Sequence, residues 1–204
     1  MLLDVDDSQL VLVDYQARLM PAMHDWVAVQ ANAVRLARVA QLMQVPLLAT
    51  AQNPDKLGPC VPELQAVLAE AGARELVKMS FSAAEGLVDL LRPPVRKLGG
   101  NARSLPRHLQ KAQPAQDEGR ASVVLAGCEA HVCLLQTALE LLEAEFEVWV
   151  VTDACSSRTE RNRDAAFDRL AGAGAELVST EMVVFEWLRS AEHPAFKAAQ
   201  ALIK

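Results

Sequence analysis

The sequence predicts an α/β fold, a three-layer α-β-α sandwich built around a mostly parallel, six-stranded sheet. Short apolar runs alternate with longer amphipathic runs along the whole chain, which is typical of strands joined by crossover helices. Several of the short runs are almost continuously apolar, as expected for strands that helices cover on both faces. With 204 residues, 51% of them hydrophobic, the chain is long enough for one domain, 1–204, with a sizeable core.

The predicted strands are short runs rich in Val, Leu and Ala. The first reads Leu-Val-Leu-Val and the fifth reads Val-Trp-Val-Val. Both are typical of buried strands. In chain order, the predicted strands are 10–13, 46–50, 74–77, 122–126, 148–151 and 176–178.

The predicted helices occupy the longer runs between the strands, where apolar residues recur at helical spacing. In chain order they are 26–43, 63–71, 82–91, 133–145 and 159–173. Ser157 and Glu160 have the spacing of a capping box, which predicts the start of the fifth helix.

One stretch does not fit the alternation of strands and helices. The part at 92–111 is rich in Arg, Lys, Pro and Gly and holds no Asp or Glu, and we expect about 92–120 to be an insertion. The helix before it should run away from the carboxyl ends of the strands. We therefore favour a contact between subunits over a lid on the site of the same chain.

Three reactive side chains follow three of the predicted strands. Asp14 follows the first strand, Lys78 the third, and Cys133 comes after the turn that follows the fourth. In an open parallel sheet the ligand crevice lies beyond the carboxyl ends of the strands. The sequence therefore predicts that Asp14, Lys78 and Cys133 converge at this edge.

Cys133 is the candidate nucleophile of the predicted site. It stands where a strand passes through a turn into a helix, and both the helix N-terminus and Lys78 are expected to lower the pKa of its thiol. A thiolate attacks a carbonyl carbon, while Asp14 would protonate the leaving amine and activate water. Backbone N–H groups of Cys133 and of an earlier turn residue would bind the oxyanion.

The chain resembles the isochorismatase-like cysteine hydrolase superfamily, in particular the isochorismatase domain-containing proteins. The motifs that carry the resemblance are Val11-Leu12-Val13-Asp14, Gln52-Asn53-Pro54 with Leu57-Gly58, Val61-Pro62-Glu63-Leu64, Lys78-Met79-Ser80-Phe81-Ser82, Cys133-Leu134-Leu135-Gln136-Thr137-Ala138 and Asp153-Ala154-Cys155-Ser156-Ser157-Arg158. The resemblance covers nearly everything outside about 92–120.

The resemblance implies a Rossmann-like, isochorismatase-type hydrolase fold and a catalytic triad that matches Asp14, Lys78 and Cys133 residue by residue. It also implies a cis peptide bond between Cys128 and Glu129, which turns the Glu129 N–H toward the site. The N–H groups of Glu129 and Cys133 would then form the oxyanion hole.

The resemblance further bears on metal binding. Nicotinamidases, which resemble this chain, carry Asp-Trp-His-Pro after the second strand, and the Asp and His of that motif bind a metal. Here the aligned residues are Ala51-Gln52-Asn53-Pro54. Ala51 cannot bind a metal and Asn53 is a poor ligand, so we expect no metal and no cofactor.

Four residues are candidates for contact with substrate. Gln52, Asn53 and Phe81 are expected to line the pocket, and Cys128 to form part of its apolar wall. The alternative is that Gln52, Asn53 and Phe81 only fasten their own loops. His131 is expected to point away from substrate.

Composition and charge exclude several classes of protein. The net charge of −6 argues against nucleic acid or an anionic membrane as partner, which leaves a small-molecule substrate. Acids near the start and the lack of a long apolar run predict a cytoplasmic location. Asp14-Tyr15-Gln16-Ala17 holds no Gly-rich phosphate loop, which argues against a NAD-binding oxidoreductase.

The first hypothesis for function is therefore a cysteine hydrolase that cleaves a C–N bond of a small amide through a thioester on Cys133. Two alternatives stay open: hydrolysis of an isochorismate-like vinyl ether, with Asp14 as the acid, and a catalytically weak, homo-oligomeric interaction protein. We also expect a homo-oligomer, dimer or larger, because the apolar run at 182–188 exceeds what one terminal helix can bury in its own domain.

Overall fold

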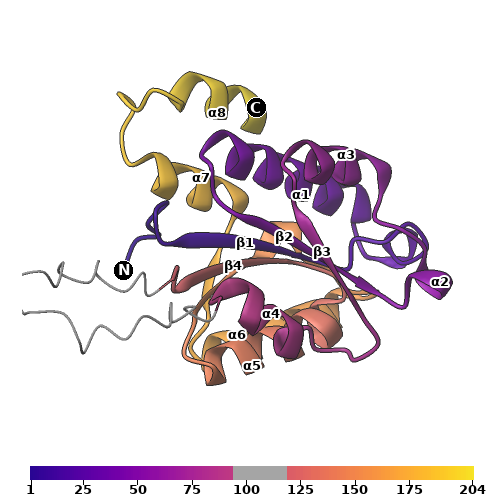
Figure 1. Cartoon of the computed structure of the whole chain (residues 1–204). Coiled ribbons are helices and arrows are strands. Elements are labelled where there is room, and N and C mark those ends of the chain that lie inside the picture. Colours follow the sequence, from indigo (N-terminus) through magenta and orange to yellow (C-terminus); the bar gives the residue numbers. More distant parts are fainter. Residues whose placement is uncertain (94–118) are drawn as a thin grey trace, which may run out of the picture.

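The computed structural model describes residues 1–93 and 119–204, and its centre is a sheet of six parallel strands (Figure 1). The strands are β1 (Ser8–Val13), β2 (Leu47–Gln52), β3 (Arg74–Lys78), β4 (Ser122–Gly127), β5 (Glu147–Val151) and β6 (Glu176–Val178). Their order across the sheet is β3-β2-β1-β4-β5-β6, and each neighbouring pair is parallel. The six predicted strands are confirmed with small shifts at their ends. The order reverses between β1 and β4, which places the ligand crevice beyond their carboxyl ends.

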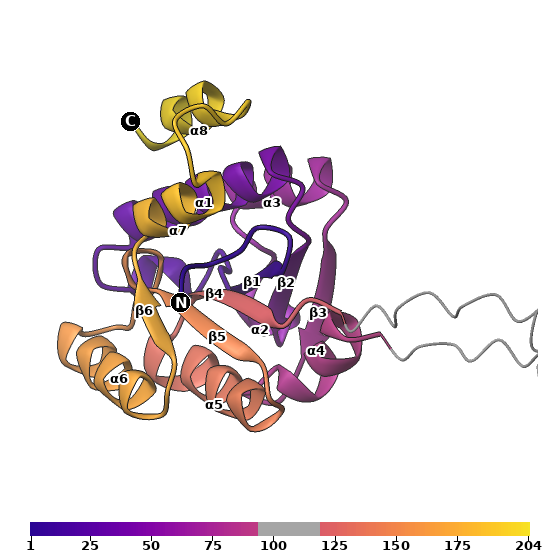
Figure 2. The same ribbon diagram turned by 90° about the vertical axis from the view of Figure 1, so that its left-hand side faces the viewer.

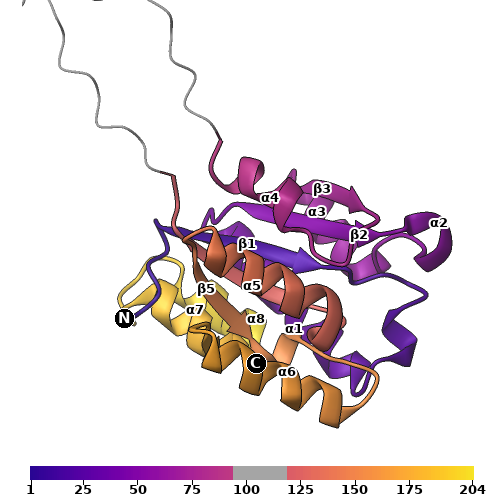
Figure 3. The ribbon, with the colours of Figure 1, turned by 90° about the horizontal axis from the view of Figure 1, so that it is seen from below.

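Helices cover both faces of the sheet, which confirms the three-layer sandwich (Figures 2 and 3). On one face lie α1 (Trp26–Leu42), α3 (Pro62–Glu70), α7 (Thr180–Leu188) and α8 (Phe196–Ile203), and on the other lie α4 (Ala84–Leu91), α5 (Leu135–Glu143) and α6 (Glu160–Gly172). Shorter helical segments are η1 (Met20–Ala22), α2 (Pro54–Leu57), η4 (Ala130–Leu134) and η5 (Thr152–Ala154). The five predicted helices are confirmed, the apolar run at 182–188 belongs to α7, and α2 and α8 were not predicted.

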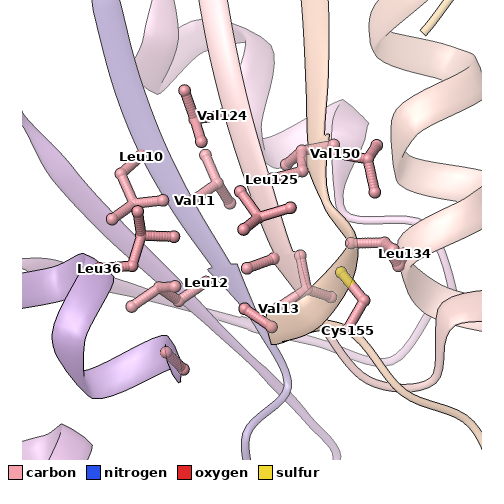
Figure 4. Packing of buried hydrophobic residues seen from close by; sticks show 14 of the residues in the cluster. Leu10, Val11, Leu12, Val13, Leu36, Val124, Leu125, Leu134, Val150 and Cys155 are labelled. Atoms are coloured by element: carbon pink, nitrogen blue, oxygen red, sulfur yellow. The ribbon is translucent and has the colours of Figure 1, made fainter. Parts of the chain in front are cut away.

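The hydrophobic core lies on both sides of the central strands. Each residue of β1 and of β4 is buried, which explains why both strands are almost continuously apolar. Figure 4 shows the side chains of β1, β4 and β5 between Leu36 of α1 and Leu134 at the end of η4. Packing of the core therefore fixes the ends of β1 and β4, which are followed by Asp14 and by the turn to Cys133.

A glycine lets β4 approach β1 closely at the carboxyl edge. Gly127 has a φ of +155°, and a Cβ built on it would lie 2.3 Å from the carbonyl oxygen of Val13. The next residue, Cys128, donates its N–H to the same oxygen at 3.0 Å. Position 127 therefore admits only glycine, and the contact fixes the turn after β4 against the residue before Asp14.

The predicted capping box at the start of α6 is wrong. The residue that caps α6 is Thr159, whose hydroxyl accepts the N–H of Asn162 at 3.3 Å. Ser157 is buried and bonds with His131 instead. The hydroxyl of Ser157 is engaged by the turn before Cys133, so it is not free to cap the helix.

The described ends of the predicted insertion lie at the amino edge of the sheet. Gln9, at the start of β1, donates to the carbonyl oxygens of Leu91 at 3.2 Å and of Arg120 at 2.9 Å. Both ends therefore lie opposite the carboxyl edge, as expected. Residues 94–118, to which the predicted subunit contact refers, lie outside the described residues.

Helix α7 buries part of the apolar run at 182–188 and leaves part of it exposed. Val183, Val184, Trp187 and Leu188 are buried, while Met182 and Phe185 are each nearly half exposed. The prediction that this run exceeds what the helix can bury in its own domain therefore rests on Met182 and Phe185. Within residues 1–93 and 119–204, the helices are too short or too polar to cross a membrane.

Candidate active site

The carboxylate of Asp14 is buried at the end of β1 and both of its oxygens are engaged. Asp14 has a φ of 55°, the left-handed conformation that Asp tolerates better than most residues. Its Oδ1 accepts the hydroxyl of Thr50 at 2.6 Å, and its Oδ2 accepts the ammonium of Lys78 at 2.7 Å. Thr50 stands beside Val13 in the register of β1 and β2, which brings its hydroxyl to this point. The carboxylate is therefore fixed in orientation and its charge is balanced.

The ammonium of Lys78 is surrounded by oxygen atoms. Lys78 is the last residue of β3, and its side chain is only 5% exposed. Besides Asp14, its Nζ lies 2.9 Å from the amide oxygen of Gln52, 2.9 Å from the carbonyl of Phe81 and 3.3 Å from that of Ser80. An ammonium has three protons, and these oxygen atoms engage all of them. Lys78 is therefore held as a fixed positive charge beside Asp14.

Cys133 lies in η4, a π-helical turn that continues into α5. Its thiol is close enough to Asp14 and Lys78 for both charges to act on it. The three side chains therefore converge, as the sequence predicted. The predicted lowering of its pKa is wrong. Burial, followed by the negative charge of Asp14, raises the pKa of Cys133 to about 12, and the opposing effect of Lys78 is smaller. The resting form is a thiol that needs a base.

The turn between β4 and η4 leads into the segment that carries Cys133. The peptide bond between Cys128 and Glu129 is cis. The N–H of Ala130 donates to the carbonyl of Ser156 at 2.7 Å, which ties the turn to the segment after β5. In the part of the chain that the structure describes, the Glu129 N–H has no protein acceptor. It is thus available to a ligand.

Side chains around this turn tie it to the segment before α6. The carboxylate of Glu129 pairs with Arg158 at 2.8 Å. Nδ1 of His131 lies 2.9 Å from the hydroxyl of Ser157, and its Nε2 lies 3.4 Å from the amide nitrogen of Asn162. His131 is therefore directed toward Ser157 and α6 and fastens the turn.

The candidate substrate residues have different surroundings. Gln52 uses its amide within the protein, because its oxygen accepts from Lys78 and its nitrogen donates to the carbonyl of Met79 at 2.8 Å. Asn53 has a left-handed backbone at the start of α2. Phe81 is exposed while its carbonyl accepts from Lys78.

Cys128 does not fit the expected role in the pocket wall. Its side chain is fully buried at the end of β4, so no surface-accessible ligand reaches it, and burial raises the pKa of its thiol to about 12. Cys155, which directly follows η5, is buried as well. In the described part of the chain, His, Cys, Asp and Glu side chains do not gather in groups of three or more that could hold a metal.

Two residues of the site were missed from the sequence. Thr50 orients Asp14, and a signal for it existed, because a hydroxyl at the end of the second strand lies beside the end of the first. Gln16 is fully buried, and its amide binds the backbone of Gln52 and of Gly58. Nothing in the sequence distinguished it from an ordinary loop glutamine.

The chain is similar to known proteins over most of its length. The Isochorismatase domain matches residues 8–182. Isochorismatase domain-containing protein 2A of Mus musculus is 36% identical over 199 residues, which cover 98% of this chain and 84% of the mouse protein.

Solved structures are similar over almost the whole chain. The MAR1 ribonuclease of Caenorhabditis elegans is 30% identical with a TM-score of 0.83, over 100% of this chain and 92% of that one. The YcaC proteins of Escherichia coli and Pseudomonas aeruginosa are each 26% identical over 98% of this chain, covering 88% and 91% of theirs, with TM-scores of 0.78 and 0.77. The Escherichia coli protein is described as an octameric hydrolase of unknown specificity. The length of the matched domain and the identity to the mouse relative mean that the chain belongs to the isochorismatase family.

Proposed function

We propose that this protein is a cysteine hydrolase that cleaves a C–N bond of a small amide through a thioester on Cys133. The observation that carries the proposal is the buried carboxylate of Asp14, paired with Lys78 and close to the Cys133 thiol. Acyl transfer requires a nucleophile and a base, and here a fixed cation accompanies them. These three groups lie beside one another at the switch point of the sheet.

In the proposed acylation step, Asp14 accepts the thiol proton as the sulfur of Cys133 attacks the carbonyl carbon. The oxyanion that forms is bound by the backbone N–H groups of Glu129 and Cys133, each worth about 3–4 kcal/mol in studied hydrolases. The C–N bond then breaks, and protonated Asp14 gives its proton to the leaving nitrogen. The products are the free amine and a thioester.

In the proposed deacylation step, Asp14 accepts a proton from water while the water oxygen attacks the thioester. The carbon–sulfur bond breaks, the acid product leaves, and the proton on Asp14 returns to the sulfur. Lys78 stays protonated throughout, because its role is to balance the charge of Asp14. The raised pKa of Cys133 supports this sequence, because a resting thiol needs the neighbouring base in each turnover.

A related structure supports a reactive nucleophile in this fold. The YcaC protein of Pseudomonas aeruginosa has been solved with covalent acrylamide. Acrylamide is a small amide and an electrophile that reacts with thiols. We take this as support for covalent chemistry and for small amides as the first compounds to screen.

The experiment is intact-mass spectrometry after incubation with a library of small amides. We expect an increase in mass that corresponds to the acyl group, on the peptide that contains Cys133, and its loss in Cys133→Ala. Turnover of a vinyl ether that survives Cys133→Ala and is lost in Asp14→Asn would instead establish the isochorismatase-type reaction. A protein without adduct or turnover on either class would contradict both enzymatic functions.

We propose a small molecule and not RNA as the substrate, although the similar protein of Caenorhabditis elegans is named a ribonuclease. The net charge of −6 disfavours a polyanion, and a base beside a thiol is suited to carbonyl chemistry. Release of fragments from a labelled RNA by the wild-type protein, but not by Cys133→Ala, would overturn this choice.

We further propose a homo-oligomer in the cytoplasm. An octameric relative and the exposed side chains of Met182 and Phe185 on α7 support the oligomer. Four free cysteines support a reducing compartment. Light scattering tests the first proposal, and a monomer at micromolar concentration would contradict it.

A further inference from the structure

We propose that Gln52, itself held by Gln16, is the positioning residue that keeps the Lys78 ammonium on Asp14. This inference rests on the proposed function, because it assigns a role within the same site. It departs from the sequence-based expectation that Gln52 binds substrate.

The orientation of the Gln52 amide is determined by its partners. Its oxygen lies 2.9 Å from Nζ of Lys78, and its nitrogen lies 2.8 Å from the carbonyl oxygen of Met79. A flipped amide would direct its NH2 group at an ammonium and its oxygen at a carbonyl oxygen, and both contacts would be repulsive. Only one orientation satisfies both partners, and that orientation aims an acceptor at Lys78.

The backbone of Gln52 is held in turn by a buried side chain. Gln16 is fully buried, and its Oε1 accepts the N–H of Gln52 at 2.9 Å. Its Nε2 donates to the carbonyl of Gln52 at 3.1 Å and to that of Gly58 at 2.7 Å. Both backbone groups of Gln52 are thus bound by one side chain, which fixes the direction in which the Gln52 side chain leaves β2.

Gln52 differs from the other neutral acceptors of Lys78. The carbonyls of Ser80 and Phe81 belong to the loop that directly follows Lys78, so they move with β3. Gln52 comes from β2, which lies between β3 and β1 in the sheet. It therefore ties the ammonium to the strand that also carries Thr50, the other partner of Asp14. Without Gln52, Lys78 keeps its local acceptors but loses the neutral contact that directs it toward the centre of the sheet.

The consequence for chemistry is electrostatic. The positive charge of Lys78 is the main factor that opposes burial and the charge of Asp14 in setting the pKa of Cys133. If Gln52 holds that charge in place, removing Gln52 changes the ionisation of the Cys133 thiol, which is not among the side-chain hydrogen-bond partners of Gln52 in the described part of the chain. A role limited to fastening the loop after β3 would leave the thiol unchanged.

The test is the pH profile of Cys133 alkylation by iodoacetamide, followed by peptide mass spectrometry in Gln52→Met and the wild type. This readout needs no substrate. We expect the apparent pKa of Cys133 to rise by about half a unit, which slows alkylation about threefold at any pH well below that pKa. The matched control is Gln65→Met, an exposed glutamine on α3, for which we expect the wild-type profile.

A double-mutant cycle with Lys78→Met establishes whether Gln52 acts through Lys78. We expect no further effect of Gln52→Met once Lys78 is replaced. Should Lys78→Met not fold by circular dichroism, Gln16→Met takes its place, and we expect it to slow alkylation and to add nothing to Gln52→Met. A wild-type profile in Gln52→Met, or a full shift that persists without Lys78, would overturn the proposal. A wild type that alkylates as expected but forms no acyl adduct would contradict the proposed function alone.

Discussion

Nζ of Lys78 lies 2.7 Å from Oδ2 of Asp14 although their strands, β3 and β1, are separated in the sheet by β2. The contact is possible because both residues stand at the carboxyl ends of their strands, where the side chain of Lys78 spans the end of β2. Both side chains are buried, so water solvates neither charge and each depends on the other. The pair is thus a fixed feature of the folded site and the basis for the first two predictions.

Replacement of Asp14 by Asn should change the thiol and the catalysis in opposite directions. The charge of Asp14 raises the pKa of Cys133, so its removal lowers that pKa and speeds alkylation at neutral pH. Turnover should fall about 10²–10⁴-fold, because the base is lost. Alkylation rates and turnover, measured on one preparation, check both. Slower alkylation in Asp14→Asn would contradict the electrostatic account.

Replacement of Lys78 by Met should destabilise the protein. It leaves the buried carboxylate of Asp14 without its cation, and breaking a buried pair costs about 3–5 kcal/mol in the free energy of unfolding. Urea unfolding followed by circular dichroism measures the difference. The control, Lys56→Met on the exposed surface of α2, should stay within about 0.5 kcal/mol of the wild type.

Replacement of Gly127 by Ala should be destabilising because the new Cβ would lie 2.3 Å from the carbonyl oxygen of Val13. Backbone cannot move aside as a flexible side chain can, so we expect a loss of about 1–3 kcal/mol or more. Gly172→Ala, at the end of α6, is the matched control, because its Cβ would meet nothing within 4 Å. Equal melting temperatures for the two variants would contradict the close approach of β4 and β1.

Stability should decline at alkaline pH. Burial raises the pKa of Cys128 from 9.0 to about 12, so the folded protein holds this proton more tightly than the unfolded chain. The resulting stabilisation is complete below about pH 9 and is lost as the pH rises toward 12, by about 1.4 kcal/mol for each pH unit. Urea unfolding at pH 8 and above pH 10 measures the decline. It should be shallower in Cys128→Ala, and an unchanged slope would refute the assignment.

Turnover should survive exhaustive chelation. The positions aligned with the metal ligands of nicotinamidases are Ala51 and Asn53, and neither is a good ligand for the metals that imidazole favours. Assays before and after dialysis against EDTA test this. Loss of turnover that zinc or manganese restores would show that other side chains bind a metal.

The sequence by itself determined the sheet and the edge at which the reactive side chains meet. Apolar runs such as 10–13 indicate strands buried on both faces, and parallel strands place residues that follow them, such as Asp14 and Lys78, at one edge. The family motifs named the same residues. These conclusions depend on the order of residues along the chain, which is what a sequence records.

Only the tertiary structure decided how the site is charged and held. The pKa of Cys133 depends on its burial and on its distances from Asp14 and Lys78, and these opposing effects cannot be ranked without those distances. The amide of Gln52 has no preferred partner in the sequence, because a glutamine bonds whichever groups the fold brings near it. Strand patterns are set by neighbours in sequence, whereas ionisation and hydrogen bonding are set by neighbours in space.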